Sequence, residues 1–282
     1  MSRNINVALI YDFDGTLSPG NMQEFGFIQA IGKDITQFWE QSNGLAHDND
    51  ASQILCYMYM MLKFAKANNI SLKRESFKKF GANIELFPGV YEWFELVNNY
   101  AKDRHITLTH FINSSGLKEM IEGTPIAKEF ENIYACSYLY DVDGVAYWPA
   151  VAVDYTAKTQ FLFKINKGIK EVSDTIQINK YTPEEDRPMP FSHMIYFGDG
   201  TTDIPSMKLV KEHGGHSIAV YGDSSKKKMA LMLIKENRAN FVCKADYTEK
   251  GEIYSVVKRI LDKIKSDNEF SRLLNIHRKR CE

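Results

Sequence analysis

The chain has 282 residues, enough for one large domain or two. Hydrophobic residues make up 44% and charged residues 25% of it, as is typical of a globular protein with a sizeable core. The 35 basic and 36 acidic residues leave a net charge of −1, which argues against a nucleic-acid partner. No signal-peptide pattern opens the chain and no apolar run approaches the ~20 residues of a membrane span, so we expect a cytoplasmic protein without a membrane partner.

Short β-rich runs, which often end in Gly, Ser or Asp, alternate with helical stretches along the chain. This alternation predicts an α/β fold with a Rossmann-like parallel sheet core covered by helices. The predicted strands are Val7–Tyr11, Ile106–Asn113, Ile133–Tyr138, Met194–Phe197, Ser217–Val220 and Phe241–Cys243.

The stretch between the first two predicted strands is far longer than an ordinary βα crossover. It shows helical spacing over Phe25–Trp39, Ser52–Ala67, Lys73–Phe80 and Val90–Tyr100. We therefore expect an inserted all-α cap domain. Pro88 and Gly89 interrupt the pattern and mark the re-entry point. The predicted division is a core of residues 1–18 and 87–282 and a cap of residues 19–86.

The segment LIYDFDGTLSPG, residues 9 to 20, places two carboxylates at the end of the first predicted strand. Side chains alternate along a strand, so Asp12 and Asp14 leave it on the same side, and Gly15 lets the backbone turn. Ligands of open α/β sheets bind beyond the carboxyl ends of the strands. This segment is therefore a candidate site.

Three further segments place polar groups near the same edge. Ser114, Ser115 and Gly116 end the second predicted strand, where two hydroxyls and a helix-opening glycine could bind phosphate. Two more carboxylates follow the fourth predicted strand, in the run Gly198-Asp199-Gly200-Thr201-Thr202-Asp203. Lys158 opens a helical stretch between them.

These four segments, in this order, resemble the haloacid dehalogenase-like (HAD) phosphohydrolases. The resemblance is to members whose helical cap lies between the first two motifs, as in phosphoserine phosphatase, and covers roughly residues 5–18 and 87–245. The D-x-D-G-T and G-D-G-x-x-D elements are its most specific parts. The resemblance implies that Asp12 is the nucleophile, Asp14 the general acid/base, Ser114 and Lys158 phosphate contacts, and Asp199 a magnesium ligand with Asp203 beside it.

Elementary chemistry supports these roles. Four carboxylates in one crevice would repel and become protonated without a cation. Mg²⁺ prefers oxygen ligands, which Asp12, Asp199 and the backbone carbonyl of Asp14 could supply. Asp12 could then attack phosphorus while Asp14 protonates the leaving group. We expect a Mg²⁺-dependent phosphatase acting on a small phosphomonoester, with Ser115 and Gly116 also in the substrate site; the sequence leaves the oligomeric state open.

Several other patterns have simpler structural interpretations. The second D-x-D-G, at 141–144, reads as a hairpin turn after the third core strand. The Met and aromatic residues at 57–64 could line a substrate pocket, but at helical spacing such residues are more often core, so we expect them in the core. The residues 47–50 are expected to supply a helix N-cap, and the lysines at 226–228 a solvated helix face. The segment 173–192, with three prolines, reads as a surface loop. The scattered Cys56, Cys136, Cys243 and Cys281 are expected to be buried or idle thiols.

Three rival functions follow from the same residues. One is a carbon–halogen hydrolase. Such enzymes do not need a second acid at the position of Asp14, so the presence of Asp14 favours phosphoryl chemistry. Another is a phosphate-binding or phospho-acceptor module, against which the cap argues because it would enclose a substrate. The third is phosphoserine phosphatase proper, which reads its substrate's amino group with a glutamate nine residues after the nucleophile. That position is Asn21 here, with Glu24 three residues on, so phosphoserine is expected to be a poor substrate.

Overall fold

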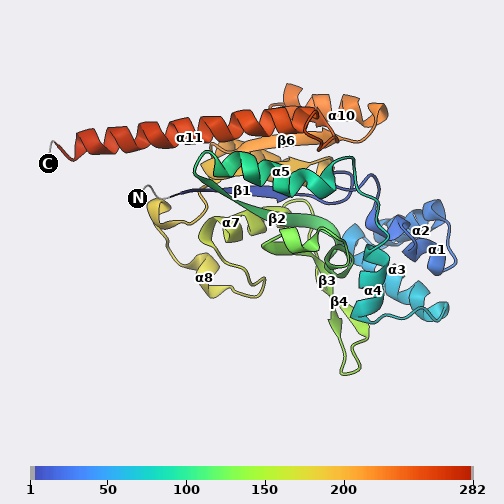
Figure 1. Cartoon of the computed structure of the whole chain (residues 1–282). Coiled ribbons are helices and arrows are strands. Elements are labelled where there is room, and N and C mark those ends of the chain that lie inside the picture. Colours follow the sequence, from blue (N-terminus) through green and yellow to red (C-terminus); the bar gives the residue numbers. More distant parts are fainter. Residues whose placement is uncertain (1–3, 281–282) are drawn as a thin grey trace.

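The fold is built on a seven-stranded sheet with the strand order β4-β3-β2-β1-β5-β6-β7 (Figure 1). The computed structural model describes residues 4–280, so Cys281 lies outside the described residues. Neighbouring strands are parallel except β3 and β4, which form an antiparallel hairpin. The strands are β1 Ile5–Tyr11, β2 Ile106–Leu117, β3 Asn132–Tyr140, β4 Ala146–Val151, β5 Met194–Gly198, β6 His216–Tyr221 and β7 Phe241–Lys244. All six predicted core strands are present, and the predicted fold class is confirmed.

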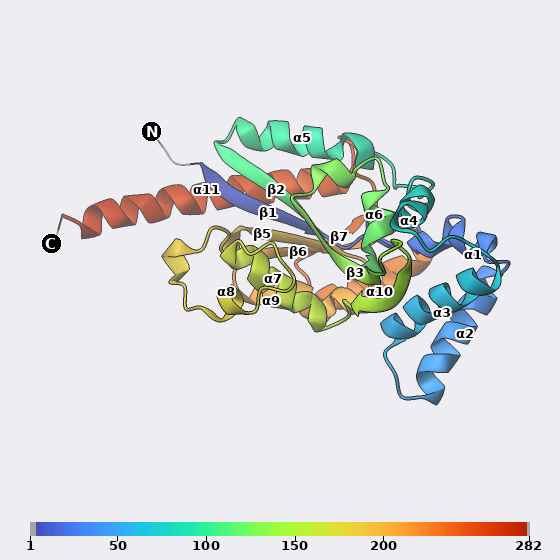
Figure 2. The same ribbon diagram turned by 90° about the horizontal axis from the view of Figure 1, so that it is seen from below.

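Helices cover both faces of the sheet (Figure 2). Helices α5 (Val90–Lys102) and α11 (Glu252–Arg278) lie on one face, and α7 (Ala157–Lys167), α9 (Ile204–Glu212) and α10 (Ser224–Lys235) lie on the other. Because both faces are covered, the central strands are apolar along almost their whole length, as in the run INVALIY of β1. The carboxyl ends of the parallel strands are thus the part of the sheet left open to a ligand.

The inserted helices form a cap at that end of the sheet, beside the β3–β4 hairpin (Figure 1). They are α1 Phe27–Ala30, α2 Ile35–Asp48, α3 Gln53–Ala67 and α4 Arg74–Gly81. The backbone N–H of Phe87 donates to the carbonyl of Leu17 at 2.9 Å, so the chain leaves the sheet and returns to it at one point. This contact supports the proposed division into a cap of 19–86 and a core of 1–18 and 87–282.

Two local predictions in the cap are wrong. The single helix predicted over Phe25–Trp39 is two helices, because Gly32 adopts a left-handed φ of 67° and Asp34 starts α2 by accepting hydrogen bonds from two backbone N–H groups. The residues 47–50 do not cap α3. They end α2 and turn the chain, and the hydroxyl of Ser52 accepts from the N–H of Leu55 instead.

Other interpretations are confirmed. The second D-x-D-G is the turn of the β3–β4 hairpin, where the exposed Asp141 carboxylate accepts from the N–H groups of Asp143 and Val145. Met58, Met60 and Met61 are buried in the core. Segment 173–192 is a largely exposed connection that contains the short α-helix α8 (Ile176–Asn179) and the 3-10 turn Glu184–Asp186. Cys56, Cys136 and Cys243 are buried free thiols.

A buried polar network ties β1 to β2 beneath the site. The Trp93 indole N–H donates to the Tyr11 hydroxyl at 2.8 Å, and that hydroxyl lies 3.1 Å from Nδ1 of His110. The other ring nitrogen of His110 lies 3.1 Å from Oδ1 of Asn98. Every member has a partner when Tyr11 donates to Nδ1 and Nε2–H donates to Asn98. Burial lowers the pKa of His110 from 6.5 to about 3, so the imidazole stays neutral in the folded protein.

This network predicts an acid-sensitive stability. The pKa of His110 is lower in the folded than in the unfolded protein. The contribution of this residue to the free energy of unfolding is therefore fully present above pH 6.5, its pKa in the unfolded chain, and is lost as the pH falls towards 3. Below pH 6.5, the free energy of unfolding should fall by about 1.4 kcal/mol per pH unit from this residue alone. Urea unfolding of the protein and of His110→Gln between pH values of about 7.5 and 4.5 measures the difference in slope. Equal slopes would show that His110 is not held neutral.

Candidate active site

The loop after β1 carries Asp12 and Asp14. The N–H of Asp12 donates to the carbonyl of Phe197 in β5 at 2.9 Å, which extends the parallel pairing to the end of the strand. Gly15 then turns the chain with a left-handed φ of 76°. A Cβ at this position would collide with the Asp199 carboxylate, so glycine also permits the close approach of the two strand ends.

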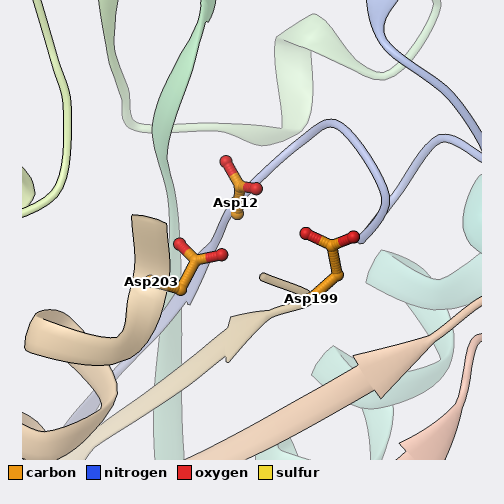
Figure 3. Close-up of side chains that lie close together, drawn as sticks. All are labelled: Asp12, Asp199 and Asp203. Carbon is orange, nitrogen blue, oxygen red and sulfur yellow. The ribbon is translucent and has the colours of Figure 1, made fainter. Parts of the chain in front are cut away.

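Asp12, Asp199 and Asp203 meet at the carboxyl ends of β1 and β5 (Figure 3). One oxygen from each of the three carboxylates lies within 4.8 Å of the others. Figure 3 shows one oxygen of Asp199 turned towards Asp12 and the other towards the loop after Asp12. The structure therefore brings together three of the four predicted carboxylates.

Lys158 bridges two of these carboxylates. It lies in the first turn of α7, is fully buried, and its Nζ donates to Oδ1 of Asp12 at 2.9 Å and to Oδ1 of Asp203 at 2.7 Å. The same oxygen of Asp203 accepts from the Tyr196 hydroxyl at 2.7 Å. Asn113 in β2 donates to the carbonyl of Lys158 at 3.0 Å and holds the start of α7 in place. Lys158 is thus fixed beside Asp12 by groups from β2, from β5 and from the segments that follow β1 and β5.

The carboxylates carry more negative charge than the protein compensates. Burial and the neighbouring Asp203 raise the pKa of Asp12 to about 7, although Lys158 opposes them. Burial and Asp203 also raise the pKa of Asp199, and Lys226 acts against them. Burial lowers the pKa of Lys158, but its two carboxylate partners outweigh burial and raise it overall. A buried oxygen cluster with this excess of charge fits a hard divalent cation such as Mg²⁺.

Asp14 faces the cap rather than the cluster. Its Oδ1 accepts from the backbone N–H of Met22 at 2.9 Å, in the segment where the chain enters the cap. Burial and the nearby Asp12 raise the pKa of Asp14 well above its usual value, and the hydrogen bond from Met22 opposes them. A raised pKa favours the protonated carboxyl, which is the form that can donate a proton to a leaving group.

The segment predicted to bind phosphate, Ser114 to Gly116, has a different backbone conformation from the predicted one. Strand β2 continues to Leu117 through a register shift, and α6 (Lys118–Glu122) begins only after it, so Gly116 does not open a helix. The N–H of Gly116 donates to the Ser114 hydroxyl at 3.1 Å, and that of Leu117 donates to the sulfur of Met22. The Ser115 hydroxyl is buried without a partner, which leaves it free for a ligand.

A pocket of about 420 Å³ lies between these residues and the cap. Its core side includes Asp12, Asp14, Ser114 and Asp199. The cap side is formed by Asn21, Gln23, Glu24, Trp39, Asn43, Gln53, Ile54 and Tyr57. The pocket volume suits a small molecule, and its polar lining suits a charged one.

Some pocket residues could not be identified from the sequence. Lys226, predicted on a solvated helix face, donates from the start of α10 to Oδ2 of Asp199 at 3.2 Å. Tyr57, predicted in the core, lines the pocket and donates to the carbonyl of Ser115 at 2.8 Å. Trp39 donates its indole N–H to the carboxylate of Glu24 at 2.9 Å. The sequence held a local signal only for Glu24, through its spacing from Asn21, and for Tyr57, one of the residues at 57–64 for which a pocket wall was the alternative to the core.

The fold is that of the HAD-like phosphatases, in the phosphoserine-phosphatase-like arrangement with a helical cap. A phosphoserine phosphatase solved as a phospho-aspartyl intermediate analogue superposes with a TM-score of 0.55 at 17% identity, over 90% of this chain and 99% of that chain. A probable phosphoserine phosphatase from Vibrio cholerae gives a TM-score of 0.53 at 10% identity, over 93% of this chain and 67% of that chain.

Sequence comparison adds a relative without a described function. An uncharacterized protein of Borreliella burgdorferi is 29% identical over 280 residues, which span 88% of this chain and 94% of the relative. No family model matches the chain. Within residues 4–280, no helix is both long enough and apolar enough to cross a membrane. The likeness to solved structures defines the fold alone.

Proposed function

We propose that the protein is a Mg²⁺-dependent phosphatase that hydrolyses a small phosphomonoester through an aspartyl-phosphate on Asp12. The observation that carries this proposal is the cluster of Asp12, Asp199 and Asp203 at the floor of a capped pocket, with the buried Lys158 between Asp12 and Asp203. A cluster of acids alone would repel a phosphate, whereas acids with a divalent cation and a lysine can bind one.

Asp12, Asp199 and the backbone carbonyl of Asp14 would hold the metal. Bound Mg²⁺ would supply positive charge against both the carboxylates and the incoming phosphate. Asp203 is in the same cluster, but its Oδ1 already accepts from Lys158 and Tyr196. We assign Asp203 to positioning Lys158 beside the metal ligands.

The chain's own groups account for both half-reactions. A carboxylate oxygen of Asp12 attacks phosphorus as the phosphorus–oxygen bond of the ester breaks, and Asp14 donates its proton to the leaving alkoxide. Asp14 then takes a proton from water, and that water attacks phosphorus, which releases phosphate and restores Asp12. Lys158 and the hydroxyls of Ser114 and Ser115 hold charge on the remaining phosphate oxygens.

Multiple turnover of p-nitrophenyl phosphate with Mg²⁺ tests the proposal against its non-catalytic rival. A phosphatase releases many equivalents of p-nitrophenol per chain, and the release stops when EDTA removes the metal. A phospho-acceptor module releases at most one equivalent and keeps the phosphoryl group. Burst size and steady-state rate in one stopped-flow trace separate the two.

Asp199→Asn should raise the Mg²⁺ concentration needed for half-maximal activity by at least about tenfold, because an amide is a weaker ligand than a carboxylate. The matched control is Asp143→Asn, which changes the same residue type in the exposed hairpin turn and should leave the Mg²⁺ dependence as in the wild type. For both variants, activity is measured as a function of Mg²⁺ concentration, and Mn²⁺ binding is measured by calorimetric titration. An unchanged requirement in Asp199→Asn would exclude Asp199 as a ligand.

Phosphoserine phosphatase proper is the second candidate, because Glu24 lies in the pocket. The turn Met22–Glu24 brings this carboxylate onto the cap side of the pocket, although Asn21 occupies the position where that family carries its glutamate. However, Oε1 of Glu24 already accepts from Asn21 at 2.6 Å and from Trp39 at 2.9 Å. Because these two donors already occupy Oε1, the Glu24 carboxylate attracts an ammonium group less strongly. We therefore still expect phosphoserine to be a poor substrate.

A comparison of kcat/KM for phosphoserine and a panel of amine-free phosphomonoesters tests this prediction. Phosphoserine should rank below at least one of them. Glu24→Gln should change all values by similar factors, because Glu24 organises the pocket rather than pairing with an ammonium. A selective loss of about ten- to hundredfold for phosphoserine, as for an ammonium deprived of its charged partner, would instead establish the amino-group contact.

A further inference from the structure

A second hollow lies on another face of cap helix α3. It has a volume of about 600 Å³. Gln53, Ile54 and Tyr57 of α3 line the candidate active site, whereas its residues Leu55, Cys56, Tyr59 and Leu62 line this groove. The opposite wall is strand β4, which lies beside α3 (Figure 1), and it contributes Tyr147, Trp148 and Pro149. The groove therefore runs along the seam between the cap and the core hairpin.

The walls of this groove leave large apolar side chains in water. Trp148 is 63% exposed, Tyr147 51%, Tyr59 50% and Leu55 43%. Single exposed apolar residues are common on proteins, but four around one concave surface mark a binding site. The volume falls within the range of roughly 300–1,000 Å³ seen for small-molecule sites.

The charges around the groove have one sign. Lys63 and Lys66, one turn apart on α3 and both exposed, are its charged lining residues, and no carboxylate is among the lining side chains. A ligand with an apolar body and an anionic end would bury the body against the aromatic walls and place the charge beside the two ammonium groups. A cationic ligand of the same shape would meet repulsion.

The strand wall disfavours a peptide that adds to the sheet. Strand β4 is the edge of the sheet, but Pro149 has no backbone N–H to donate, and the β3–β4 pairing contains two register shifts. Both features interrupt the regular row of donors and acceptors that an added strand needs. Side-chain contacts, which suit a small molecule, are what the groove offers.

We propose that this groove is a second ligand site, for a small amphiphilic anion. The ligand class is an apolar chain or ring system that ends in one carboxylate, sulfate or phosphate group. Its apolar body packs between Tyr59 and Trp148, and its anionic end pairs with Lys63 and Lys66. This site is separate from the phosphate pocket, so the proposal stands whether or not the protein is a phosphatase.

Calorimetric titration of the full chain with dodecanoate tests the proposal, with dodecyltrimethylammonium as the chain-matched cation, both below their micellar concentrations. We expect saturable binding of one dodecanoate per chain in the micromolar range and at least tenfold weaker binding of the cation. Trp148→Ser should weaken dodecanoate binding at least tenfold. The control Tyr181→Ser, an exposed aromatic residue elsewhere on the surface, should not.

Reversing the charge of the two lysines tests the predicted preference for an anion more directly. Lys63→Glu with Lys66→Glu should weaken dodecanoate binding and strengthen binding of the cation, whereas Lys235→Glu with Lys250→Glu, two exposed lysines away from the groove, should change neither. Equal affinity for both amphiphiles, or binding insensitive to Trp148 and to the α3 lysines, would overturn the proposal. Concentration-dependent dimers that Trp148→Ser abolishes, without dodecanoate binding, would assign the groove to a second copy of the chain instead.

Discussion

Replacing Asp12 by Asn should lower turnover of p-nitrophenyl phosphate by about 10⁴-fold or more, because the amide cannot attack phosphorus. The fold should survive. Asn keeps the shape of the side chain, Lys158 keeps Asp203 as a partner, and a carboxyl whose burial is unfavourable is removed. Steady-state kinetics together with urea unfolding measure the two effects separately.

The hairpin turn supplies a matched control for this substitution. Asp143→Asn alters the second D-x-D-G of the chain, which is exposed and far from the carboxylate cluster in the sequence, and should leave the rate within about twofold of the wild type. A residual rate within tenfold of the wild type in Asp12→Asn would refute its assignment as the nucleophile. A hundredfold loss of turnover rate in Asp143→Asn, with normal stability, would show that the catalytic carboxylates lie in the second D-x-D-G and not in the segment that contains Asp12.

Lys158→Met should have the largest effect on stability. It leaves Asp12 and Asp203 buried without their shared cation, and breaking a buried ion pair in this way costs about 3–5 kcal/mol. Without Lys158, which opposes the rise, the pKa of Asp12 rises further, so the folded protein gains stability when this carboxyl is protonated. The loss should be larger at a pH of about 8 than at about 5.5. Urea unfolding at the two pH values measures it.

A double variant separates charge from packing. Lys158→Met with Asp203→Asn removes one of the two stranded carboxylates and should recover part of the stability, without recovering activity, because the phosphate contact is still missing. If the single variant lost less than about 1 kcal/mol, or if the double variant were no more stable than the single one, Lys158 would not be the counter-charge of this cluster.

The sheet could be predicted because its strands are short, nearly continuous apolar runs bounded by turn residues. The run before Asp12 and the run before Asp199 each read as a buried strand, and parallel strands bring their carboxyl ends to one edge. The meeting of Asp12 and Asp199 in space therefore follows from patterns at two separate places in the chain, whereas Lys158 was placed beside them by the family resemblance.

The remaining parts of the site depend on long-range packing. Nothing near Lys226 distinguishes it from its neighbours Lys227 and Lys228, and only the placement of α10 brings it to Asp199. Tyr196 looks like any interior strand residue, yet it shares Asp203 with Lys158. The extra length of β2 through Gly116 was missed because Asn, Ser and Gly usually mark turns, whereas here a register shift keeps them in the strand.

A covalent phosphoryl group on Asp12 is the central intermediate of the proposed mechanism. Rapid mixing of the protein with p-nitrophenyl phosphate and Mg²⁺, an acid quench within the first turnovers, and peptide mass spectrometry measure this. We predict the mass of one phosphoryl group on the peptide that contains Asp12, absent from Asp12→Asn and lost at longer times as phosphate is released. A phosphoryl group on another residue, or p-nitrophenol release in steady state with none trapped on the protein at any time, would contradict the account.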